Sequence, residues 1–521
     1  MPRRLELIEG SQTECLQRVQ CLLPAAGVVF WLTGSAIKKA HTLLGQECDA
    51  LVFDAHSGFD VNTFAAVSGT LRGGGTLFLL IPPLDEWAAF PDPDYQRFLP
   101  YPYTPEQVEG RFLRRLVWLL ARRSGFSPTT LLFDEKAVGL KPNLQQAVIQ
   151  TILQSEVPVV LTADRGRGKS AALGMAASQL QASGKRVLLT APSRATVVSV
   201  FKHADNPPLF FAPDELLQTL PAGDVLLVDE AAAIPVPLLL KMLEHYPRCV
   251  FSTTLHGYEG SGRGFALRFQ KQLDALAPDW MAVRLQQPIR WAENDPLEHF
   301  INQALLLDAE SAVVPFDYAQ GTNYHCLNRD ELTQNEPLLR QLFGLLITAH
   351  YQTRPSDLRQ MLDAPDISIH VLEQSGLIVA VALLSREGGL DAELTAAIHA
   401  GTRRPHGHPI PQTLTFHAKI PTAAELICER VMRIAVHPDR QNHGWGAHLL
   451  EHLLGFATRS GADYVGVSYA MTPELLRFWE RAGFVLARVG FRQDTASGSR
   501  SVVQVKALSA RAHALFKGLE Q

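Results

Sequence analysis

The sequence lacks the features that mark secreted, membrane-spanning and small zinc-binding proteins. Its six cysteines are scattered without a Cys-x-x-Cys pair or a His/Cys cluster, which argues against structural zinc and favours a reducing compartment. No apolar run approaches the ~18 residues of a membrane span, and residues 1–4 are not followed by a hydrophobic segment of signal-peptide type. Internal repeats and low-complexity tracts are absent as well. We therefore expect a soluble, cytoplasmic protein with no membrane contact.

An excess of positive charge is also missing. With 48 basic and 52 acidic residues the formal net charge is −4, so any contact with nucleic acid must come from local patches rather than from a bulk field. Two arginine-rich segments are candidates, namely Arg111, Arg114, Arg115, Arg122 and Arg123, and then Arg403 and Arg404. Apolar residues interleave with the first segment, so a solvated helix face explains it equally well.

The chain has ample length and apolar content. Its 521 residues, 46% hydrophobic and 19% charged, are enough for about three or four domains that each bury a core. Short apolar runs alternate with helical stretches, which predicts a multidomain α/β protein with parallel strands. We place an N-terminal α/β domain at 1–130, a second domain at 131–330, a third at 331–510 and a short tail at 511–521.

A glycine-rich loop in the second domain has the pattern of a phosphate loop between a strand and a helix. Gly166 and Gly168 permit a tight backbone that turns its amides toward a phosphate, and Lys169 would reach the β- and γ-phosphates of a nucleotide. Ser170 would ligate Mg²⁺. The strict pattern has glycine where this chain has Ala163.

An acidic motif downstream supports this interpretation. Residues 224–228 form an apolar run that ends in two carboxylates, Asp229 and Glu230. Asp229 suits the Mg²⁺ shell, and Glu230 suits orienting or deprotonating the attacking water. Residues 252–254 follow the next strand, where helicase-like cores place a coupling segment, and Arg290 offers a charge for the γ-phosphate. The second domain is therefore predicted to be an ATPase.

A second nucleotide site is predicted near the C-terminus. A strand ending at Val436 leads into a Gln-x-x-Gly-x-Gly-Ala loop at the start of a helix, and such a loop presents successive amides to the pyrophosphate of coenzyme A. The loop residues of the pattern are Gln441, Gly444, Gly446 and Ala447. Residues 478–484 supply a second segment typical of acetyltransferases. Amides near Val436 would polarise a thioester carbonyl and stabilise the tetrahedral oxyanion.

The two sites together constrain the function. Acetyl transfer from a thioester is already downhill and needs no ATP, so the ATPase must act on something other than the bond being made. A large, folded substrate that has to be moved or opened is the obvious candidate.

These segments resemble the tRNA(Met) cytidine acetyltransferase family. The resemblance runs in order over nearly the whole chain and rests on residues 54–83, 162–171, 229–235, 257–264, 288–290, 403–405 and 441–447. It implies that the second domain is a P-loop, helicase-like ATPase and that the third is a GNAT-type N-acetyltransferase. Family members of the bacterial type usually continue into a C-terminal tRNA-binding domain, whereas this chain stops at Gln521. The RNA contact is therefore expected to rest on the remaining surface.

The resemblance also implies the substrates and the residues that bind them. The enzyme would use acetyl-CoA, ATP and Mg²⁺ to form N4-acetylcytidine at the wobble position of elongator tRNA(Met), with no obligate protein partner evident. ATP would contact Gln145 or Gln146, Ala163, Asp164, Arg165, Gly166, Arg167, Gly168, Lys169, Ser170, Ala171, Asp229 and Arg290. Acetyl-CoA would contact Ile434, Ala435, Val436, Gln441, Asn442, His443, Gly444, Trp445, Gly446, Ala447, Glu474 and Arg481. We predict that Arg111, Arg114, Arg115, Arg403 and Arg404 bind the RNA.

The sequence alone does not identify the general acid and the general base of acetyl transfer. The exocyclic amine of cytosine is already neutral, so attack on the thioester needs no strong base. Glu429 and His437 are candidates, although Glu429 also suits the wet face of a strand and His437 also suits a turn cap. Many acetyltransferases carry a tyrosine as general acid where this chain has Trp479, so the departing thiolate would take its proton from elsewhere, such as water.

Two other functions compete with RNA acetylation. One is a protein or small-molecule N-acetyltransferase with a regulatory NTPase domain, and the other is a non-catalytic RNA remodeller that only senses acetyl-CoA. RNA-stimulated ATP hydrolysis separates the first of these from the RNA-directed functions.

Overall fold

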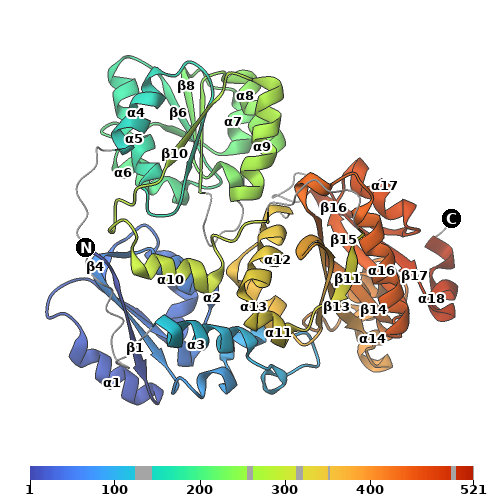
Figure 1. Ribbon diagram of the computed structural model, residues 1–521. Coiled ribbons are helices and arrows are strands. Elements are labelled where there is room, and N and C mark those ends of the chain that lie inside the picture. The colour runs from blue at the N-terminus through green and yellow to red at the C-terminus, as the bar shows by residue number, and fades with distance from the viewer. Residues whose placement is uncertain (124–143, 255–261, 313–320, 350–352, 494–499, 520–521) are drawn as a thin grey trace. The chain divides into compact units, whose positions relative to one another are not determined.

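The computed structural model describes residues 1–123, 144–254, 262–312, 321–349, 353–493 and 500–519 (Figure 1). No helix in these ranges is long and apolar enough to cross a membrane. The chain separates into two compact units. The first unit comprises Met1–Glu86, Trp118–Asp308 and Tyr351–Ser356, and the second comprises Trp87–Val117, Ala309–His350 and Asp357–Gln521.

The first unit begins with a parallel sheet in the order β1-β4-β3-β2. Its strands are β1 (Arg4–Glu9), β2 (Val29–Leu32), β3 (Cys48–Asp54) and β4 (Leu71–Ile81), and its main helices are α1 (Gln12–Leu22) and α2 (Val61–Ser68). Helix α1 begins at a capping box formed by Ser11 and Glu14. Buried side chains of α1, including Cys15 and Val19, pack against Ile8, Val52 and Leu80 of the sheet. The predicted parallel α/β pattern is confirmed here.

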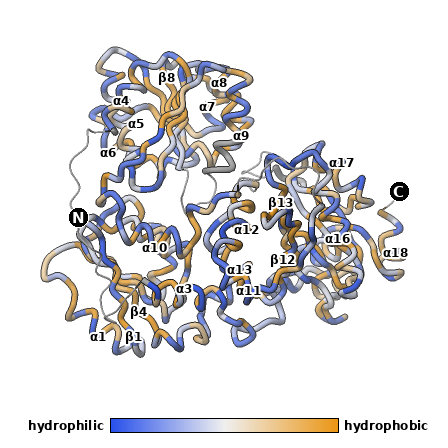
Figure 2. The backbone as a smooth tube through the Cα atoms, viewed as in Figure 1, coloured by the Kyte–Doolittle hydropathy of each residue, from blue (hydrophilic) through white to orange (hydrophobic). Residues whose placement is uncertain are grey.

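A second parallel sheet in the same unit has the order β10-β5-β9-β8-β6-β7. Its strands are β5 (Val159–Ala163), β6 (Val187–Thr190), β7 (Leu209–Phe211), β8 (Val225–Val228), β9 (Cys249–Thr254) and β10 (Met281–Leu285). The strands are rich in hydrophobic residues because helices cover both faces (Figure 2). Leu227 points into one core cluster and Val228, the next residue, into the other.

Helices flank this sheet on both sides (Figure 1). On one side lie α4 (Leu144–Gln154), α5 (Lys169–Ala182) and α6 (Val198–Lys202), and on the other α7 (Pro213–Thr219), α8 (Val236–His245) and α9 (Gly262–Leu276). Helix α10 (Pro296–Leu305) follows β10 and contacts α2 and β1 of the first sheet. These contacts explain why the two sheets form one compact unit.

The second unit is built on a seven-stranded sheet in the order β11-β12-β13-β14-β15-β17-β16. Its strands are β11 (Asn323–Cys326), β12 (Ile367–Gln374), β13 (Leu377–Gly388), β14 (Ile427–Val436), β15 (Tyr464–Ala470), β16 (Val485–Gln493) and β17 (Arg500–Ala507). The end of β14 at Val436 agrees with the strand predicted from the sequence. Among these described strands, β14 and β15 pair in parallel and all other neighbours are antiparallel.

Different helices cover the two faces of this sheet. Helix α16 (Trp445–Arg459) and helix α17 (Pro473–Arg481) pack on one face around Val431 and Val465. Helix α15 (Pro409–Gln412), a π-helical turn at Thr413–His417 and helix α18 (Ala510–Phe516) pack on the other face around Cys428 and Tyr464. The remaining helices of the unit are α11 (Arg329–Gln334), α12 (Glu336–Ala349), α13 (Pro355–Asp363) and α14 (Ala392–Ala400).

Residues 87–117 group with the second unit, although the sequence placed them in the range 1–130. This segment includes the start of α3 (Arg111–Arg123) and is held by Arg359 of α13. The fully buried Arg359 guanidinium donates to Asp92 at 2.7 Å and to Asp94 at 3.0 Å. Contacts between residues so far apart in the chain have no local sequence signal. The ranges 1–130, 131–330, 331–510 and 511–521 stay predictions as domain limits.

Arg359→Ala should strongly destabilise the second unit. The substitution removes the Arg359 charge from the buried carboxylates of Asp92 and Asp363, and breaking a buried pair from one side costs about 3–5 kcal/mol. Arg97→Ala is the matched control, because Arg97 also pairs with Asp94 but is exposed and should cost about 1 kcal/mol or less. Urea unfolding followed by circular dichroism measures both, and equal midpoints for the two variants would contradict this role of Arg359.

Candidate functional sites

The carboxyl ends of β5, β9 and β8 bring the predicted ATPase residues together. These strands are neighbours in the sheet and run in parallel, so the segments that follow them meet at one edge. The glycine-rich loop follows β5, Ser252 lies in β9, and Asp229 and Glu230 follow β8. Helix α5 begins at Lys169, directly after the loop.

Lys169 lies between the two carboxylates. Its Nζ donates to Asp229 Oδ1 at 2.9 Å and to Glu230 Oε1 at 2.7 Å. Burial opposes the charge of the ammonium group, but the two carboxylates overcome this effect and raise the pKa of Lys169 above its usual value. Lys169 is therefore a fixed cation at the loop, and it must exchange a carboxylate for a phosphate oxygen if it is to serve a nucleotide.

The side chains around Asp229 form a compact set of oxygen donors. Ser170 donates to Asp229 Oδ2 at 2.7 Å, and Ser252 donates to Asp229 Oδ1 at 3.1 Å. A hydroxyl and a carboxylate are ligands suited to Mg²⁺, which takes few protein ligands and completes its shell with water and phosphate oxygens. Within the described ranges, no group of three or more His, Cys, Asp or Glu side chains could hold a metal by itself.

Both loop glycines have a backbone that requires glycine. Gly166 has φ of +76° and Gly168 has φ of +79°. A Cβ on Gly166 would lie 2.3 Å from the Trp291 ring, and one on Gly168 would lie 2.5 Å from Ile289. The segment after β10 thus packs directly on the loop, a contact that the sequence analysis missed because these residues lie more than a hundred positions from the loop.

Of the two glutamines left open by the sequence, Gln145 contacts the loop. Its Nε2 donates to the carbonyl of Gly168 at 3.0 Å. Arg290, in contrast, donates to the carbonyl of Gly69 at 3.1 Å and lies 3.4 Å from Glu47, both outside the loop. In this conformation Arg290 connects the two sheets of the first unit and would have to turn to reach a γ-phosphate.

The predicted acyl-CoA site lies where β14 and β15 separate. The two strands pair from Cys428 opposite Tyr464 to Val431 opposite Val467, and β14 then continues to Val436 without this neighbour. The ladder to β13 also shifts register here, leaving Met432 without an opposite residue. Backbone groups along this edge of β14 therefore have no partner in β15 and can bind a ligand that enters the opening.

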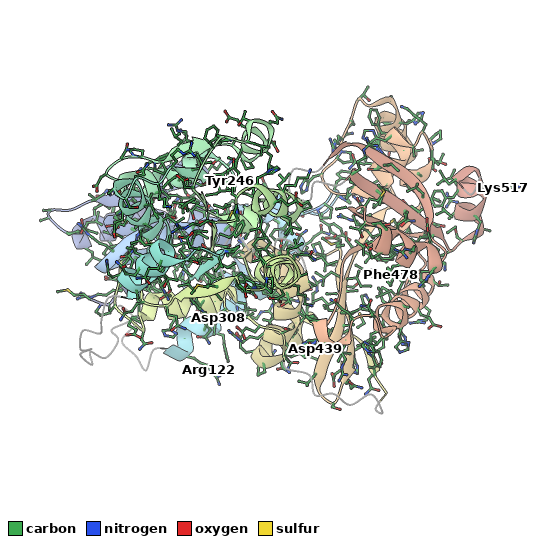
Figure 3. All side chains as sticks on the ribbon, turned by 90° about the horizontal axis from the view of Figure 1, so that it is seen from above. Arg122, Tyr246, Asp308, Asp439, Phe478 and Lys517 are labelled. Carbon is green, nitrogen blue, oxygen red and sulfur yellow. The ribbon has the colours of Figure 1, made fainter. Side chains whose placement is uncertain are left out.

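The loop after β14 ends at the N-terminus of α16. Gly444 is the N-cap residue with φ of +84°, and a Cβ at this position would meet no described atom within 4 Å. The N-terminal amides of a 15-residue helix therefore face open space, as an anion site requires. Gly446 is needed for packing, since its Cβ would lie 3.4 Å from Phe478 of α17 and 3.5 Å from Val436 (Phe478 is labelled in Figure 3).

The two candidate bases have other partners. His437 Nε2 lies 2.7 Å from the Ala312 carbonyl, so this nitrogen carries the hydrogen, and Nδ1 accepts from the Asp439 amide at 3.3 Å. Glu429 is buried and accepts from Arg386 at 2.8 Å, and burial raises its pKa. Glu429 also lies seven residues before Val436, or about 20 Å of extended strand. This geometry favours a capping role for His437 and an ion-pair role for Glu429.

Beside Trp479, which stands where many acetyltransferases carry a tyrosine, lies a tyrosine that the sequence analysis missed. Trp479 is buried and its ring stacks on Tyr469 of β15 with a centroid distance of 6.3 Å. The Tyr469 hydroxyl donates to Gln504 at 2.6 Å, and burial raises the pKa of Tyr469 to about 12. Glu474 and Arg481 of α17 are both exposed. Tyr469 follows the end of β14–β15 pairing by two residues, so it is the tyrosine nearest to that opening along β15.

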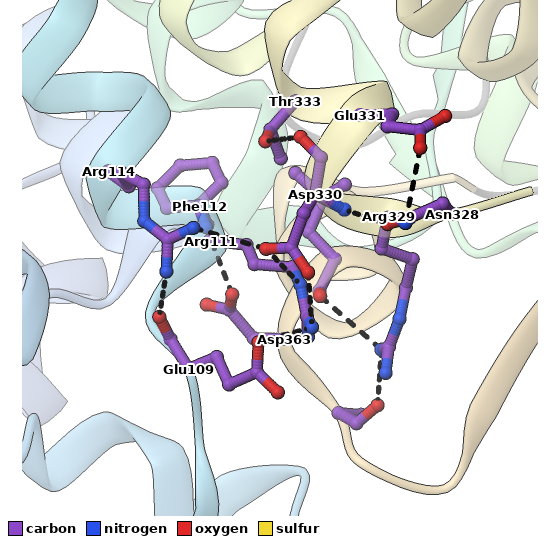
Figure 4. A network of polar contacts seen from close by, with 12 residues as sticks. Glu109, Arg111, Phe112, Arg114, Asn328, Arg329, Asp330, Glu331, Thr333 and Asp363 are labelled. Carbon is purple, nitrogen blue, oxygen red and sulfur yellow. Dashed lines mark hydrogen bonds and ion pairs between the residues drawn. The ribbon is translucent and has the colours of Figure 1, made fainter.

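Three arginines of the first segment, Arg111, Arg114 and Arg115, form ion pairs in the second unit (Figure 4 shows those of Arg111 and Arg114). The buried Arg111 donates twice to Asp330, at 3.0 and 2.9 Å, and the half-exposed Arg114 donates to the same carboxylate at 3.1 Å. The fully buried Arg115 side chain binds both oxygens of Glu336. Arg111 and Arg115 therefore hold α3 against α11 and α12 and present no surface to a phosphate. RNA binding by Arg111, Arg114 and Arg115 stays a prediction, which these buried ion pairs disfavour for Arg111 and Arg115, whereas Arg114 keeps an exposed side chain.

The second arginine segment, Arg403 and Arg404, differs from the first in exposure and pairing. Arg403 and Arg404 are exposed after the end of α14, and neither has a side-chain hydrogen bond or ion pair within the described residues. The family motif at 257–264 lies largely outside the part of the chain that the structure describes.

Comparison with family models covers nearly the whole chain. Residues 2–127 match the N-terminal model of tRNA(Met) cytidine acetyltransferase TmcA, and residues 160–207 and 208–308 match the helicase domain of RNA cytidine acetyltransferase NAT10/TcmA. Residues 341–462 and 455–509 match GNAT acetyltransferase 2. The chain belongs to the TmcA family. The strand order, the phosphate loop and the opening between β14 and β15 are thus the architecture of a TmcA-type helicase domain and GNAT domain.

Individual proteins of the TmcA family are similar to most of this chain. The tRNA(Met) cytidine acetyltransferase TmcA of Nitrosococcus halophilus is 42% identical, over 99% of this chain and 76% of the relative. The protein of the same name from Vibrio cholerae is 39% identical over 90% of this chain and 67% of the relative. The protein of the same name from Haloferax volcanii is 35% identical over 91% of this chain and 70% of the relative.

Proposed function

We propose that the protein acetylates the exocyclic amine of the wobble cytidine in elongator tRNA(Met), using acetyl-CoA and ATP in the cytoplasm. The observation that carries the proposal is the presence in one TmcA-family chain of an intact phosphate loop with its acidic partners and of an open helix N-terminus beside unpaired β14. The first is suited to ATP, and the second to the pyrophosphate and thioester of acetyl-CoA.

The acetyl-transfer site works by positioning and by hydrogen bonding. The N-terminal amides of α16 would hold the pyrophosphate, and the edge of β14 up to Val436 would hold the thioester carbonyl. As the neutral amine attacks, negative charge grows on the carbonyl oxygen, and a β14 amide that donates to this oxygen lowers the barrier. The tetrahedral intermediate then collapses, its C–S bond breaks, and the CoA thiolate leaves and takes a proton from water. The attacking nitrogen gives up its proton to water after attack, so a strong base near the opening is not required.

The ATPase site would act on the RNA rather than on the thioester. Lys169 would neutralise the β- and γ-phosphates, Ser170 and Asp229 would hold Mg²⁺, and Glu230 would orient the attacking water. Gln145, beside the loop, would contact the nucleotide. Nucleotide binding must move Lys169 away from at least one carboxylate. The first unit therefore has two states, which differ in the partners of Lys169: one with nucleotide bound and one without. A cycle between these two states can perform mechanical work on a folded RNA, such as exposing a paired or stacked cytidine.

Nucleoside analysis of tRNA tests the function directly. A strain lacking this gene should contain no N4-acetylcytidine in its elongator tRNA(Met), and the wild-type gene on a plasmid should restore it. A plasmid carrying the Gly444→Glu variant is the control for acetyl-CoA dependence and should not restore it. An unchanged amount of N4-acetylcytidine in the deletion strain would overturn the proposal, and ATP hydrolysis insensitive to added tRNA would favour a protein or small-molecule substrate.

A further inference from the structure

One surface of the second unit combines unpaired cations with an exposed aromatic ring. We call it the Phe416 patch and define it by Arg404, Phe416, His417, Lys419 and Arg488. Phe416 and His417 end the π-helical turn at Thr413–His417, Lys419 follows it, and Arg488 lies on the neighbouring strand β16. A single π-helical turn is an uncommon local structure that occurs frequently at functional sites.

The members of the patch lie close to one another. Lys419 Nζ lies 4.8 Å from the centroid of the Phe416 ring, and the Phe416 and His417 rings meet edge to face with centroids 4.8 Å apart. Burial first, and then the charges of Arg488, Arg404 and Lys419, lower the pKa of His417. The charges of all three cations therefore act on His417, and this lowering of its pKa favours the neutral ring at pH 7, which can donate one hydrogen bond.

The three cations are not neutralised by any described residue of the protein. Within the described ranges, Arg404, Lys419 and Arg488 have no carboxylate partner and no side-chain hydrogen bond, in contrast to the paired Arg111 and Arg115. Their mutual repulsion has no compensation in this part of the chain, so the patch favours a polyanionic ligand.

Phe416 is a partly exposed aromatic ring next to these cations. Its side chain is 37% exposed, and one flank of the ring packs on the backbone of Gly401, where a Cβ would lie 2.8 Å from Phe416 Cε2. Gly401, which has φ of +77°, thus packs against one side of the Phe416 ring. The exposed part of the ring leaves an apolar surface among the positive charges. An aromatic ring among cations is the combination with which proteins bind single-stranded nucleic acid, by stacking on a base while cations contact the adjacent phosphates.

The patch lies on the sheet face opposite to α16 and α17. Helices α16 and α17, which carry the predicted acetyl-CoA residues, cover one face of the sheet. Helix α15 and the π-helical turn pack on the opposite face, around Cys428 and Tyr464. A thioester that enters the opening between β14 and β15 from the α16 side leaves the opposite face to the substrate.

We propose that the Phe416 patch binds a single-stranded segment of the RNA substrate, with Phe416 stacking on one unpaired base and Arg404, Lys419 and Arg488 contacting the flanking phosphates. This inference rests on the proposed function and adds where the RNA is held. An anticodon loop supplies what the patch requires, since its bases are unpaired and its backbone is continuous with the target cytidine. The patch accounts for RNA binding despite the formal net charge of −4.

Substitutions at Phe416 test the stacking. Loss of one base–aromatic stack costs about 1–3 kcal/mol, so Phe416→Ala should raise KM for an elongator tRNA(Met) transcript about five- to a hundredfold. Phe416→Trp, which keeps a stacking surface, should stay close to wild type, and Phe416→Leu, which keeps only apolar bulk, should behave like alanine. Acetyl-CoA affinity, ATP hydrolysis without RNA and the melting temperature should be the same in all four proteins.

Substitutions of the cations test their binding to phosphate. Arg404→Ala with Lys419→Ala should reduce the slope of log affinity against log salt by about 0.7 for each phosphate that is no longer neutralised, measured by filter binding at several salt concentrations. Lys517→Ala, an exposed lysine of the same unit outside the patch, is the matched control and should leave the slope unchanged.

The outcomes separate this inference from the proposed function. Wild-type acetylation of the transcript with an unchanged KM in Phe416→Ala would overturn the patch and leave the function standing. Wild-type protein that binds the transcript through the patch without acetylating it would overturn the function and leave the patch standing. Equal affinities of wild type and of the Arg404→Ala, Lys419→Ala double variant for the transcript, with polyglutamate bound more tightly by wild type than by the double variant, would overturn the RNA assignment and show that the patch is a site for acidic protein.

Discussion

Lys169→Ala should lower ATP hydrolysis by about a hundredfold or more, since loss of one preorganised charge that stabilises a transition state costs about 10²–10³ in kcat. The structure explains the size of this effect, because Nζ of Lys169 is the cation held at the loop by Asp229 and Glu230. Acetylation of the RNA should fall without vanishing, because the thioester supplies the chemical driving force. Phosphate release and acetylation by the purified variant measure both effects.

The controls for Lys169→Ala must separate catalysis from folding. The variant leaves the fully buried Asp229 without its cation, so some loss of stability accompanies the loss of activity. Acetyl-CoA affinity reports on the second unit and should be unchanged. Lys185→Ala, an exposed lysine shortly after α5, should hydrolyse ATP normally. Undiminished ATP hydrolysis in Lys169→Ala would contradict the assignment of the phosphate loop.

Gly444→Glu should abolish acetyl-CoA binding at ordinary cofactor concentrations. The new carboxylate would project into the open space at the N-terminus of α16, where the pyrophosphate needs the helix amides. Two unit charges about 4 Å apart near a protein surface repel by about 4 kcal/mol, which corresponds to about a thousandfold in affinity. Isothermal titration calorimetry with acetyl-CoA measures the loss, and ATP hydrolysis should persist.

Two control variants isolate the charge from the backbone. Gly444→Ala carries the strain of a left-handed residue, about 1–2 kcal/mol, without the carboxylate. Gly376→Glu places a glutamate at a glycine with φ of +79° and equally open surroundings, in the turn between β12 and β13. Gly376→Glu should bind acetyl-CoA normally, and Gly444→Ala should bind it much more tightly than Gly444→Glu. Unchanged acetyl-CoA affinity in Gly444→Glu would place the cofactor elsewhere.

Local sequence patterns were sufficient for the loop and helix backbone of the two predicted nucleotide sites. The phosphate loop, the strand that ends at Asp229 and the loop that leads into α16 each depend on residues within about ten positions of one another, so spacing alone predicts their backbone. The same applies to the parallel strands of the first unit, whose apolar runs are continuous because helices cover both faces.

The tertiary structure decided which charged side chains are available. Arg111 and Arg403 look alike in the sequence, but the partner of Arg111 is Asp330, which only the fold brings to it. His437 is likewise a plausible base until the Ala312 carbonyl meets its Nε2. A local pattern specifies the conformation of a loop, whereas the protonation, pairing and exposure of a side chain depend on groups hundreds of residues away. The sequence by itself therefore determined the backbone of the two predicted nucleotide sites, and only the folded chain decided which cations are paired with carboxylates of the protein.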